Sequence, residues 1–155
     1  MRRSSVELVV FVGLQASGKS TVYYERFSGT HRHVSKDLFP HNRDKNRRQE
    51  HLIRAALSTG RSVVVDNTNP SAAIRAPLIE LGKRHGARIL GYFFESDVQA
   101  CLERNARREG RARVPEVGLF ATLKLLEPPR RAEGFEALHL VRLAPEGGFL
   151  VTPLE

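Results

Sequence analysis

The residues that most constrain this chain form the string Gly-Leu-Gln-Ala-Ser-Gly-Lys-Ser at residues 13–20, directly after the apolar run 6–12. The glycines let the backbone curl so that its N–H groups point at a bound phosphate. The lysine neutralises β- and γ-phosphate charge, and the serine hydroxyl ligates Mg²⁺. Such a string arises by chance in about one chain in a hundred, and its place after a strand argues against coincidence. We therefore expect a P-loop that binds a nucleoside triphosphate.

The motif predicts a contiguous set of nucleotide-binding residues, with Ser20 also a ligand of Mg²⁺. The predicted set is Gly13, Gln15, Ala16, Ser17, Gly18, Lys19, Ser20 and Thr21. The helix predicted over residues 17–26 begins inside the loop, so its positive N-terminus points at the phosphates. The helix dipole and the loop would then act on the same ligand.

The length of 155 residues, with 41% hydrophobic and 27% charged residues, predicts a single domain over residues 1–155. The single cysteine, Cys101, argues against disulfides, including one to a partner chain, and a reducing cytoplasm is the expected location. Because no apolar run approaches the ~20 residues that span a bilayer, we expect no membrane association.

The net charge of +8 favours acidic partners such as nucleic acid, with an arginine-rich surface of no binding role as the alternative. The six histidines show no spacing typical of a metal site, and we assign them no chemistry. His31 and His33 would share one face of a strand, but two ligands without a third rarely make a site.

Apolar runs alternate with helical patterns along the whole chain. Strands are expected at 6–12, 31–35, 61–65, 88–94 and 137–141, and helices at 17–26, 44–57, 69–84, 97–108 and 116–126. This alternation predicts an α/β fold of the P-loop NTPase type: a parallel five-stranded sheet with helices on both faces and a short arginine-rich lid. Gly147 and Gly148 in the tail indicate either a hairpin turn or a frayed end.

Asp66 follows the β-branched run 63–65, where a buried strand emerges from the sheet. A carboxylate at this position of a P-loop fold accepts hydrogen bonds from Mg²⁺-bound water or from the P-loop serine. The alternative is a helix cap. We expect Asp66 to take part in the metal site with Ser20, and residues 67–69 to shape the turn.

Asp37 lies just beyond the second predicted strand, where an acceptor would approach the γ-phosphate. A carboxylate there can accept the proton of the attacking hydroxyl. From the spacing alone, a helix cap is the favoured interpretation.

The segment 104–115 is the densest basic stretch of the chain and reads as a mobile lid over the triphosphate. Arg104 and Arg108 would lie one helical turn apart on one face, where they can neutralise charge on the transferred phosphoryl group. For Arg107, Arg111 and Arg113 an exposed surface role is an equally good interpretation.

In combination these motifs resemble the polynucleotide 5′-hydroxyl kinases, specifically the kinase domain of phage and animal end-healing enzymes. The similarity runs almost from end to end. The matching pieces are 13–21, Ser35-Lys36-Asp37, 66–70 (Asp-Asn-Thr-Asn-Pro), 104–108, Val114-Pro115 and 132–135 (Ala-Glu-Gly-Phe). The P-loop is shared with many kinases, whereas Asp-Asn-Thr-Asn-Pro and Glu-Gly-Phe are more selective.

The resemblance implies that Asp37 is the general base on a nucleic-acid 5′-hydroxyl and that Lys19 and Arg108 stabilise the γ-phosphate. It also implies that Arg104 assists in the lid and that the nucleotide is ATP, used with Mg²⁺. Phage relatives carry an arginine three residues after the base, where this chain has Pro40. This departure leaves open the preference among DNA, RNA and end structures.

The expected function is therefore ATP-dependent transfer of the γ-phosphate to the 5′-hydroxyl ends of DNA or RNA. One alternative is a kinase that acts on a small-molecule hydroxyl of a sugar, nucleoside or antibiotic. Another is a nucleotide-dependent binding module without transfer. The sequence marks no pocket for a purine base.

Overall fold

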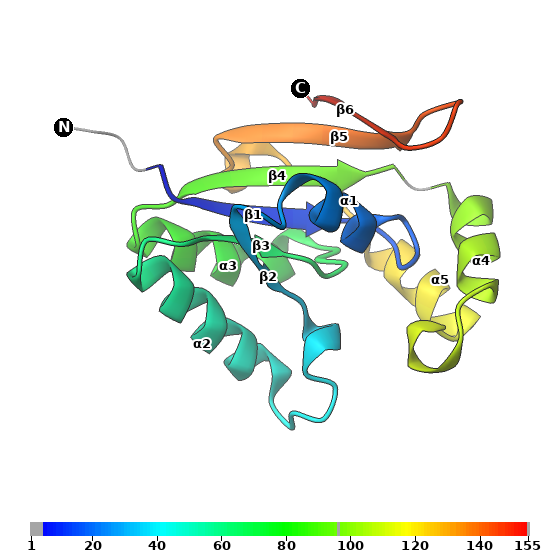
Figure 1. Ribbon diagram of the computed structural model, residues 1–155, viewed down its shortest axis with the longest axis horizontal. Helices are drawn as coiled ribbons and strands as arrows, with labels where there is room; N and C mark the ends of the chain where they lie inside the picture. Colours follow the sequence, from blue (N-terminus) through cyan, green and yellow to red (C-terminus); the bar gives the residue numbers. More distant parts are fainter. Residues whose placement is uncertain (1–4, 96, 155) are drawn as a thin grey trace.

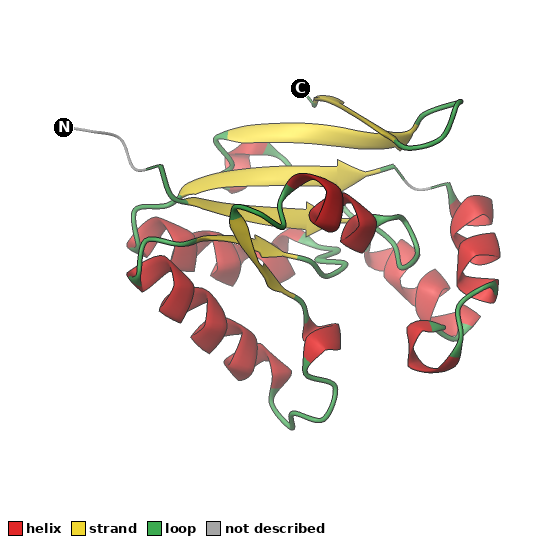
Figure 2. Ribbon diagram, viewed as in Figure 1, coloured by secondary structure: helices red, strands yellow, loops and turns green. Residues whose placement is uncertain are grey.

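The computed structural model describes residues 5–95 and 97–154 and shows a six-stranded sheet with helices on both faces (Figures 1 and 2). The strands are β1 (Glu7–Val12), β2 (His31–Val34), β3 (Ser62–Val65), β4 (Arg88–Phe94), β5 (Ala137–Leu143) and β6 (Phe149–Pro153). The α-helices are α1 (Lys19–Arg26), α2 (Lys45–Ser58), α3 (Ala72–Arg84), α4 (Val98–Ala106) and α5 (Glu116–Leu125). Short 3₁₀ turns are η1 (Lys36–Leu38), η2 (Gly110–Ala112) and η3 (Arg131–Glu133).

The strand order is β2-β3-β1-β4-β5-β6, and the first five of these strands are parallel. Val9 of β1 pairs with Val64 of β3 on one side and with Leu90 of β4 on the other. Both neighbours of β1 are therefore central strands, which explains its uninterrupted apolar sequence. The predicted α/β P-loop NTPase fold is confirmed.

The prediction of five strands is wrong, because β6 adds an antiparallel strand beside β5. Gly147 and Gly148 have φ of 95° and 76°, which glycine adopts without a steric cost. They form the turn of a hairpin in which the Ala144 N–H donates to the Gly148 carbonyl. Of the two interpretations of the tail, the hairpin is correct.

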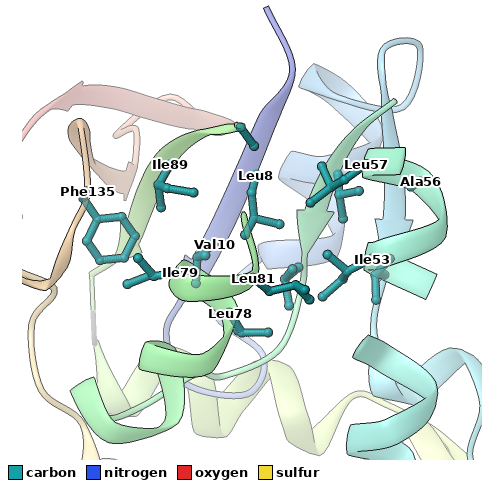
Figure 3. Packing of buried hydrophobic residues seen from close by; sticks show 14 of the residues in the cluster. Leu8, Val10, Ile53, Ala56, Leu57, Leu78, Ile79, Leu81, Ile89 and Phe135 are labelled. Carbon is teal, nitrogen blue, oxygen red and sulfur yellow. The ribbon is translucent and has the colours of Figure 1, made fainter. Parts of the chain in front are cut away.

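Side chains alternate across β1, so each face of the sheet receives its own core. One face packs Leu8, Val10 and Val12 against α2 and α3, as Figure 3 shows for Ile53 and Leu78. The other face carries Val9 and Phe11 and is covered by α1. A third, smaller cluster of Leu14, Cys101 and Leu119 fixes α4 and α5 beside the P-loop.

All parallel strands end on the same side of the sheet, where the P-loop follows β1 and η1 follows β2, and α4 and α5 lie beyond the P-loop (Figure 1). In such sheets ligands bind at the carboxyl ends of the strands. No helix among the described residues is both long and apolar enough to cross a membrane.

Candidate functional site

The P-loop connects β1 to α1 and has the backbone of an anion cradle. Ala16 and Gly18 lie in the left-handed region, with φ of 63° and 99°. Gly18 is the N-cap residue of α1 and has no side chain to satisfy the first N–H groups of the helix. These N–H groups are available to a phosphate, and they lie within the set of residues that the sequence predicts to bind the nucleotide, Gly13 and 15–21.

Lys19 is buried in this cradle, and its ammonium donates to the carbonyls of Gly13 at 3.1 Å and Leu14 at 2.6 Å. Its pKa is lowered to about 8: burial is the main cause and the charge of Arg108 acts in the same direction, while the charges of Asp66 and Asp37 oppose the shift. The charges of these three predicted site residues thus reach Lys19 from three separate segments. A bound polyphosphate would supply the anion that this buried cation lacks.

Ser20 and Asp66 lie together as the sequence predicts. The Ser20 hydroxyl donates to Asp66 Oδ2 at 2.8 Å, and Asp66 is almost fully buried at the end of β3. Asp66 is not a helix cap, because Ser71 caps α3 instead. A hydroxyl and a carboxylate suit Mg²⁺, which is usually held by one or two carboxylates together with substrate phosphates.

The cradle contains two buried polar atoms that have no hydrogen-bond partner among the described residues, Gln15 Oε1 and Ser17 Oγ. Orphaned buried polar groups are rare and usually indicate a missing ligand or ion. Gln15 Nε2 is occupied, since it donates to Thr122 Oγ1 of α5 at 2.9 Å. Together with the uncapped N–H groups at the start of α1, these atoms fit a site built for a polyphosphate and its metal ion.

Asp37 lies in η1, one turn beyond β2, and its side chain is exposed. It is not a helix cap. Ser35 caps η1 by accepting from the Asp37 N–H at 3.3 Å, and Asp44 caps α2. The carboxylate is thus free for chemistry, and its charge raises the pKa of Lys19.

The two lid arginines reach the cradle from different backbone positions. Arg104 lies in α4, and its Nη1 donates to the Ala16 carbonyl at 3.4 Å. The prediction that Arg104 and Arg108 share a helix face is wrong, because α4 ends at Ala106. Arg108 lies in the following loop and donates to the Ala112 carbonyl at 3.2 Å. The side chain of Arg111 lies outside the described part of the structure.

A cavity of about 410 Å³ lies between the lid and the P-loop, on the side of the β5–β6 hairpin. It is lined by Ala16, Gly18, Thr21, Glu25, Arg104, Arg108, Leu143, Gly148 and Phe149. The guanidinium carbon of Arg104 lies 5.8 Å from the centre of the Phe149 ring. An aromatic ring next to a phosphate cradle suits the base of a nucleotide. Sequence reasoning missed Phe149 because it missed β6.

His33 is a second residue that sequence reasoning missed. Its Nε2 lies 2.7 Å from Asp66 Oδ2, the same oxygen that accepts from Ser20. The imidazole stacks on Tyr23 of α1 with ring centres 4.0 Å apart. The position of His33 follows from the order of the strands, which the sequence does not show. β2 lies beside β3, and alternate residues of β2 face α1.

The selective motifs 66–70 and 132–135 meet behind the P-loop. Arg75 of α3 is fully buried and donates to both carboxylate oxygens of Glu133, at 2.8 and 3.0 Å. Its Nη1 donates to the Asn69 carbonyl at 2.8 Å, and Asn69 Nδ2 donates to the Phe11 carbonyl.

One more hydrogen bond links this network to the P-loop: the Gly13 N–H donates to the Thr68 carbonyl at 3.0 Å. The network therefore reaches the first glycine of the P-loop. Packing around the nucleotide site explains both motifs without a contact to nucleic acid. No motif in the sequence singles out Arg75.

Comparison with known proteins agrees with this geometry. The chain is similar to the bifunctional polynucleotide phosphatase/kinase of Schizosaccharomyces pombe, with 27% identity over 135 residues. The match covers 83% of this chain and 32% of the fungal protein, so the chain spans about a third of that relative's length.

Solved structures share the fold at identities below 25%. Kti12 of Chaetomium thermophilum, in complex with ADP-AlF3, has a TM-score of 0.69 at 19% identity and covers 87% of this chain and 88% of its own. A gluconokinase of Sinorhizobium meliloti has a TM-score of 0.61 at 23% identity, with coverage of 92% and 85%. The profile of the AAA domain family matches residues 8–129, from β1 to beyond α5. The chain therefore belongs to the AAA domain family, and its fold is that of a P-loop NTPase.

Proposed function

We propose that this protein is an ATP-dependent kinase that transfers the γ-phosphoryl group to the 5′-hydroxyl of DNA or RNA. The observation that carries the proposal is the geometry of the P-loop: the buried ammonium of Lys19 lies in the loop, and the hydroxyl of the adjacent Ser20 donates to Asp66 at the end of β3. Phosphoryl transfer needs mainly positioning and charge neutralisation, and this arrangement offers both.

Each residue has a role that follows from its place. Lys19 and the N–H groups of the loop bind the β- and γ-phosphates, and Arg104 and Arg108 neutralise charge on the transferred group. Asp37 orients the attacking hydroxyl and accepts its proton. Ser20 and Asp66 would hold Mg²⁺, which neutralises the phosphates and bridges their oxygens.

Two observations support a nucleic-acid acceptor. The relative in Schizosaccharomyces pombe is named as a polynucleotide phosphatase/kinase, although this chain spans only part of it. The net charge of +8 also suits a polyanion, whose binding releases counterions from each contacted phosphate.

A small-molecule hydroxyl is the second candidate acceptor, and a cavity of about 470 Å³ between α2 and α3 favours it. That volume suits a small organic ligand. The fold is shared with a gluconokinase of Sinorhizobium meliloti. Salt separates the two candidates, because binding of a polyanion weakens steeply with added salt and binding of a neutral acceptor does not.

The test is transfer of label from γ-labelled ATP with Mg²⁺ to 5′-hydroxyl oligonucleotides and to a panel of sugars and nucleosides. Labelling of the oligonucleotide, lost by a factor of about 10² or more in Asp37→Asn, supports the proposal. Asp44→Asn is the matched control, because asparagine caps a helix as well as aspartate does. Transfer only to a small acceptor would favour the second candidate, and tight ATP binding with no transfer would leave a binding module.

A further inference from the structure

The cavity between α2 and α3 lies next to η1, the 3₁₀ turn that carries Asp37. The two helices pack side by side against the face of the sheet opposite α1 (Figure 1). The cavity is lined by Lys36, Asn46, Gln49, Glu50, Asn69, Ile74, Pro77, Leu78, Glu80, Leu81 and Arg84. None of these residues belongs to the P-loop or the lid, so this space is separate from the nucleotide cradle.

One end of the cavity adjoins the reacting groups. Lys36 immediately precedes Asp37 in η1, and Asn69 ends the loop that begins at Asp66. Asn67 joins these segments: its Oδ1 accepts from the Lys36 N–H at 2.9 Å, and its Nδ2 donates to Gln49 Oε1 at 2.6 Å. A group held in the cavity would therefore lie next to η1, the turn that carries Asp37.

The lining of the cavity is largely apolar and nearly neutral. Ile74, Pro77, Leu78 and Leu81 form the wall along α3, while the carboxamides of Asn46 and Gln49 face it from α2.

The carboxylates in the lining already have cationic partners. Glu80 pairs with Arg84 at 2.7 Å, and Glu50 pairs with Arg54 at 2.5 Å. The apolar wall and the carboxamides fit an uncharged ring with hydrogen-bonding edges, while the cationic Lys36 lies at the end of the cavity next to Asp37. Nucleobases have both properties, with an apolar face and polar edges.

We propose that this cavity binds the base of the nucleoside that carries the attacked 5′-hydroxyl. The inference rests on the proposed function, because it assigns a place to the acceptor of that reaction. The base would pack against the α3 wall and direct its edge at Asn46 and Gln49. Its sugar would then present the 5′-oxygen to Asp37, while the phosphates of the strand remain outside the cavity.

The test measures binding of two short 5′-hydroxyl oligonucleotides by fluorescence anisotropy, with the fluorophore on the 3′ end. They differ only in the terminal 5′ residue, which carries a base in one and is abasic in the other. Ile74→Trp fills the cavity, because Ile74 is 46% exposed and lines it. Ala76→Trp is the matched control, since Ala76 is exposed on α3 and does not line the cavity.

We expect the unaltered protein to bind the oligonucleotide with a base about ten-fold more tightly than the abasic one. Ile74→Trp should abolish this preference by weakening only the former, and Ala76→Trp should retain it. Unchanged ATP binding and thermal midpoint would show that both variants are folded.

The outcomes separate this inference from the proposed function. Equal binding of the two oligonucleotides by the unaltered protein, or equal weakening of both by Ile74→Trp, would overturn the base pocket while leaving the kinase in place. Absence of binding to either oligonucleotide, together with absence of label transfer to their 5′ ends, would overturn both.

Discussion

Arg75 and Glu133 form a two-bonded ion pair inside the protein, with Nε and Nη2 of the guanidinium donating to the two carboxylate oxygens. Arg75 has no exposed surface, and its third hydrogen bond reaches the Asn69 carbonyl. Burial alone would raise the pKa of Glu133, but the hydrogen bonds from Arg75 and the Arg130 N–H lower it below the usual value. The pair therefore ties α3 and η3 to the loop that supports the P-loop.

Arg75→Met should lower the free energy of unfolding by about 3–5 kcal/mol, because it leaves Glu133 without its buried partner. The double variant Arg75→Met/Glu133→Met should recover much of that loss, since neither charge is then left alone. Urea unfolding at neutral pH measures both. Arg84→Met is the control, because its pair with Glu80 is exposed to solvent and its loss should leave the free energy of unfolding almost unchanged.

The ion pair of Arg75 and Glu133 also makes the stability of the fold depend on pH in the acid range. A carboxyl with a lowered pKa in the folded state stabilises the protein above its unfolded-state pKa. That stability is lost as the pH falls through the folded-state pKa. Glu133→Gln should therefore flatten the fall in stability on acidification, and an unchanged acid profile would contradict this role.

Lys19 predicts a proton linkage to nucleotide binding. Its pKa is about 8 in the free protein because of burial, and phosphate oxygens beside the ammonium would raise it. Binding near pH 8 should therefore take up about half a proton, and the apparent affinity should fall as the pH rises above this value. Calorimetry in buffers of different ionisation enthalpy measures the uptake.

Lys19→Met supplies the control, because it removes the titrating group and should abolish the uptake. For the free protein the sign of the pH dependence is the same as for Glu133, because both groups have a lowered pKa in the folded state. The unfolded chain holds the Lys19 proton up to its ordinary pKa of 10.5, so this group makes stability rise with pH from about 8 to 10.5. Proton release on binding above pH 8 would contradict the placement of phosphate beside Lys19.

Much of the fold was predictable because its signals are local. The uniform apolar run of β1 and the β-branched run of β3 indicated central parallel strands, and both lie there. β6 was missed because Phe149–Pro153 is short and ends in proline, and its pairing with β5 depends on a turn of two left-handed glycines. β6 therefore forms because it pairs with β5, and the sequence of β6 alone does not predict this pairing.

The candidate site also contains residues that local sequence patterns predict and residues whose roles depend on the order of the strands. The contact between Ser20 and Asp66 could be predicted, because the P-loop and the end of the neighbouring strand have fixed places in this kind of sheet. The structure brings the two side chains into a hydrogen bond. His33 was missed because its contact with Asp66 requires the order and register of β2 and β3, which periodicity does not supply. Arg108 was placed on α4 because the helical pattern continues past Ala106, where the chain leaves the helix.

Asp66→Asn should weaken the dependence of nucleotide binding on Mg²⁺. The substitution keeps the shape of the side chain but removes the charge that a hard cation requires. Titration of Mg²⁺ against a fluorescent ATP analogue should show the half-saturating concentration raised by about ten-fold or more. Binding measured without Mg²⁺ should change little, and Asp44→Asn should match the unaltered protein. An equal loss with and without Mg²⁺ would assign Asp66 a structural role instead.

From the position of the Phe149 ring we predict that the cavity beside the β5–β6 hairpin binds the base of the nucleotide. The ring lies close to Gly18: a Cβ built on this glycine would come 2.4 Å from the Phe149 ring, and Arg104 lies over the ring. A base in the adjoining cavity would stack on these groups, which contributes about 1–3 kcal/mol for an aromatic side chain. Phe149→Ala should therefore weaken ATP binding by about ten-fold or more.

Inorganic tripolyphosphate separates this base contact from the phosphate cradle, because it carries the charges of ATP without the nucleoside. Its affinity, measured by competition with a fluorescent ATP analogue, should be the same for Phe149→Ala and for the unaltered protein. Phe120→Ala, which removes an exposed ring from α5, should affect neither ligand. If Phe149→Ala weakened ATP and tripolyphosphate alike, Phe149 would support the P-loop backbone through Gly18, and the base would lie elsewhere.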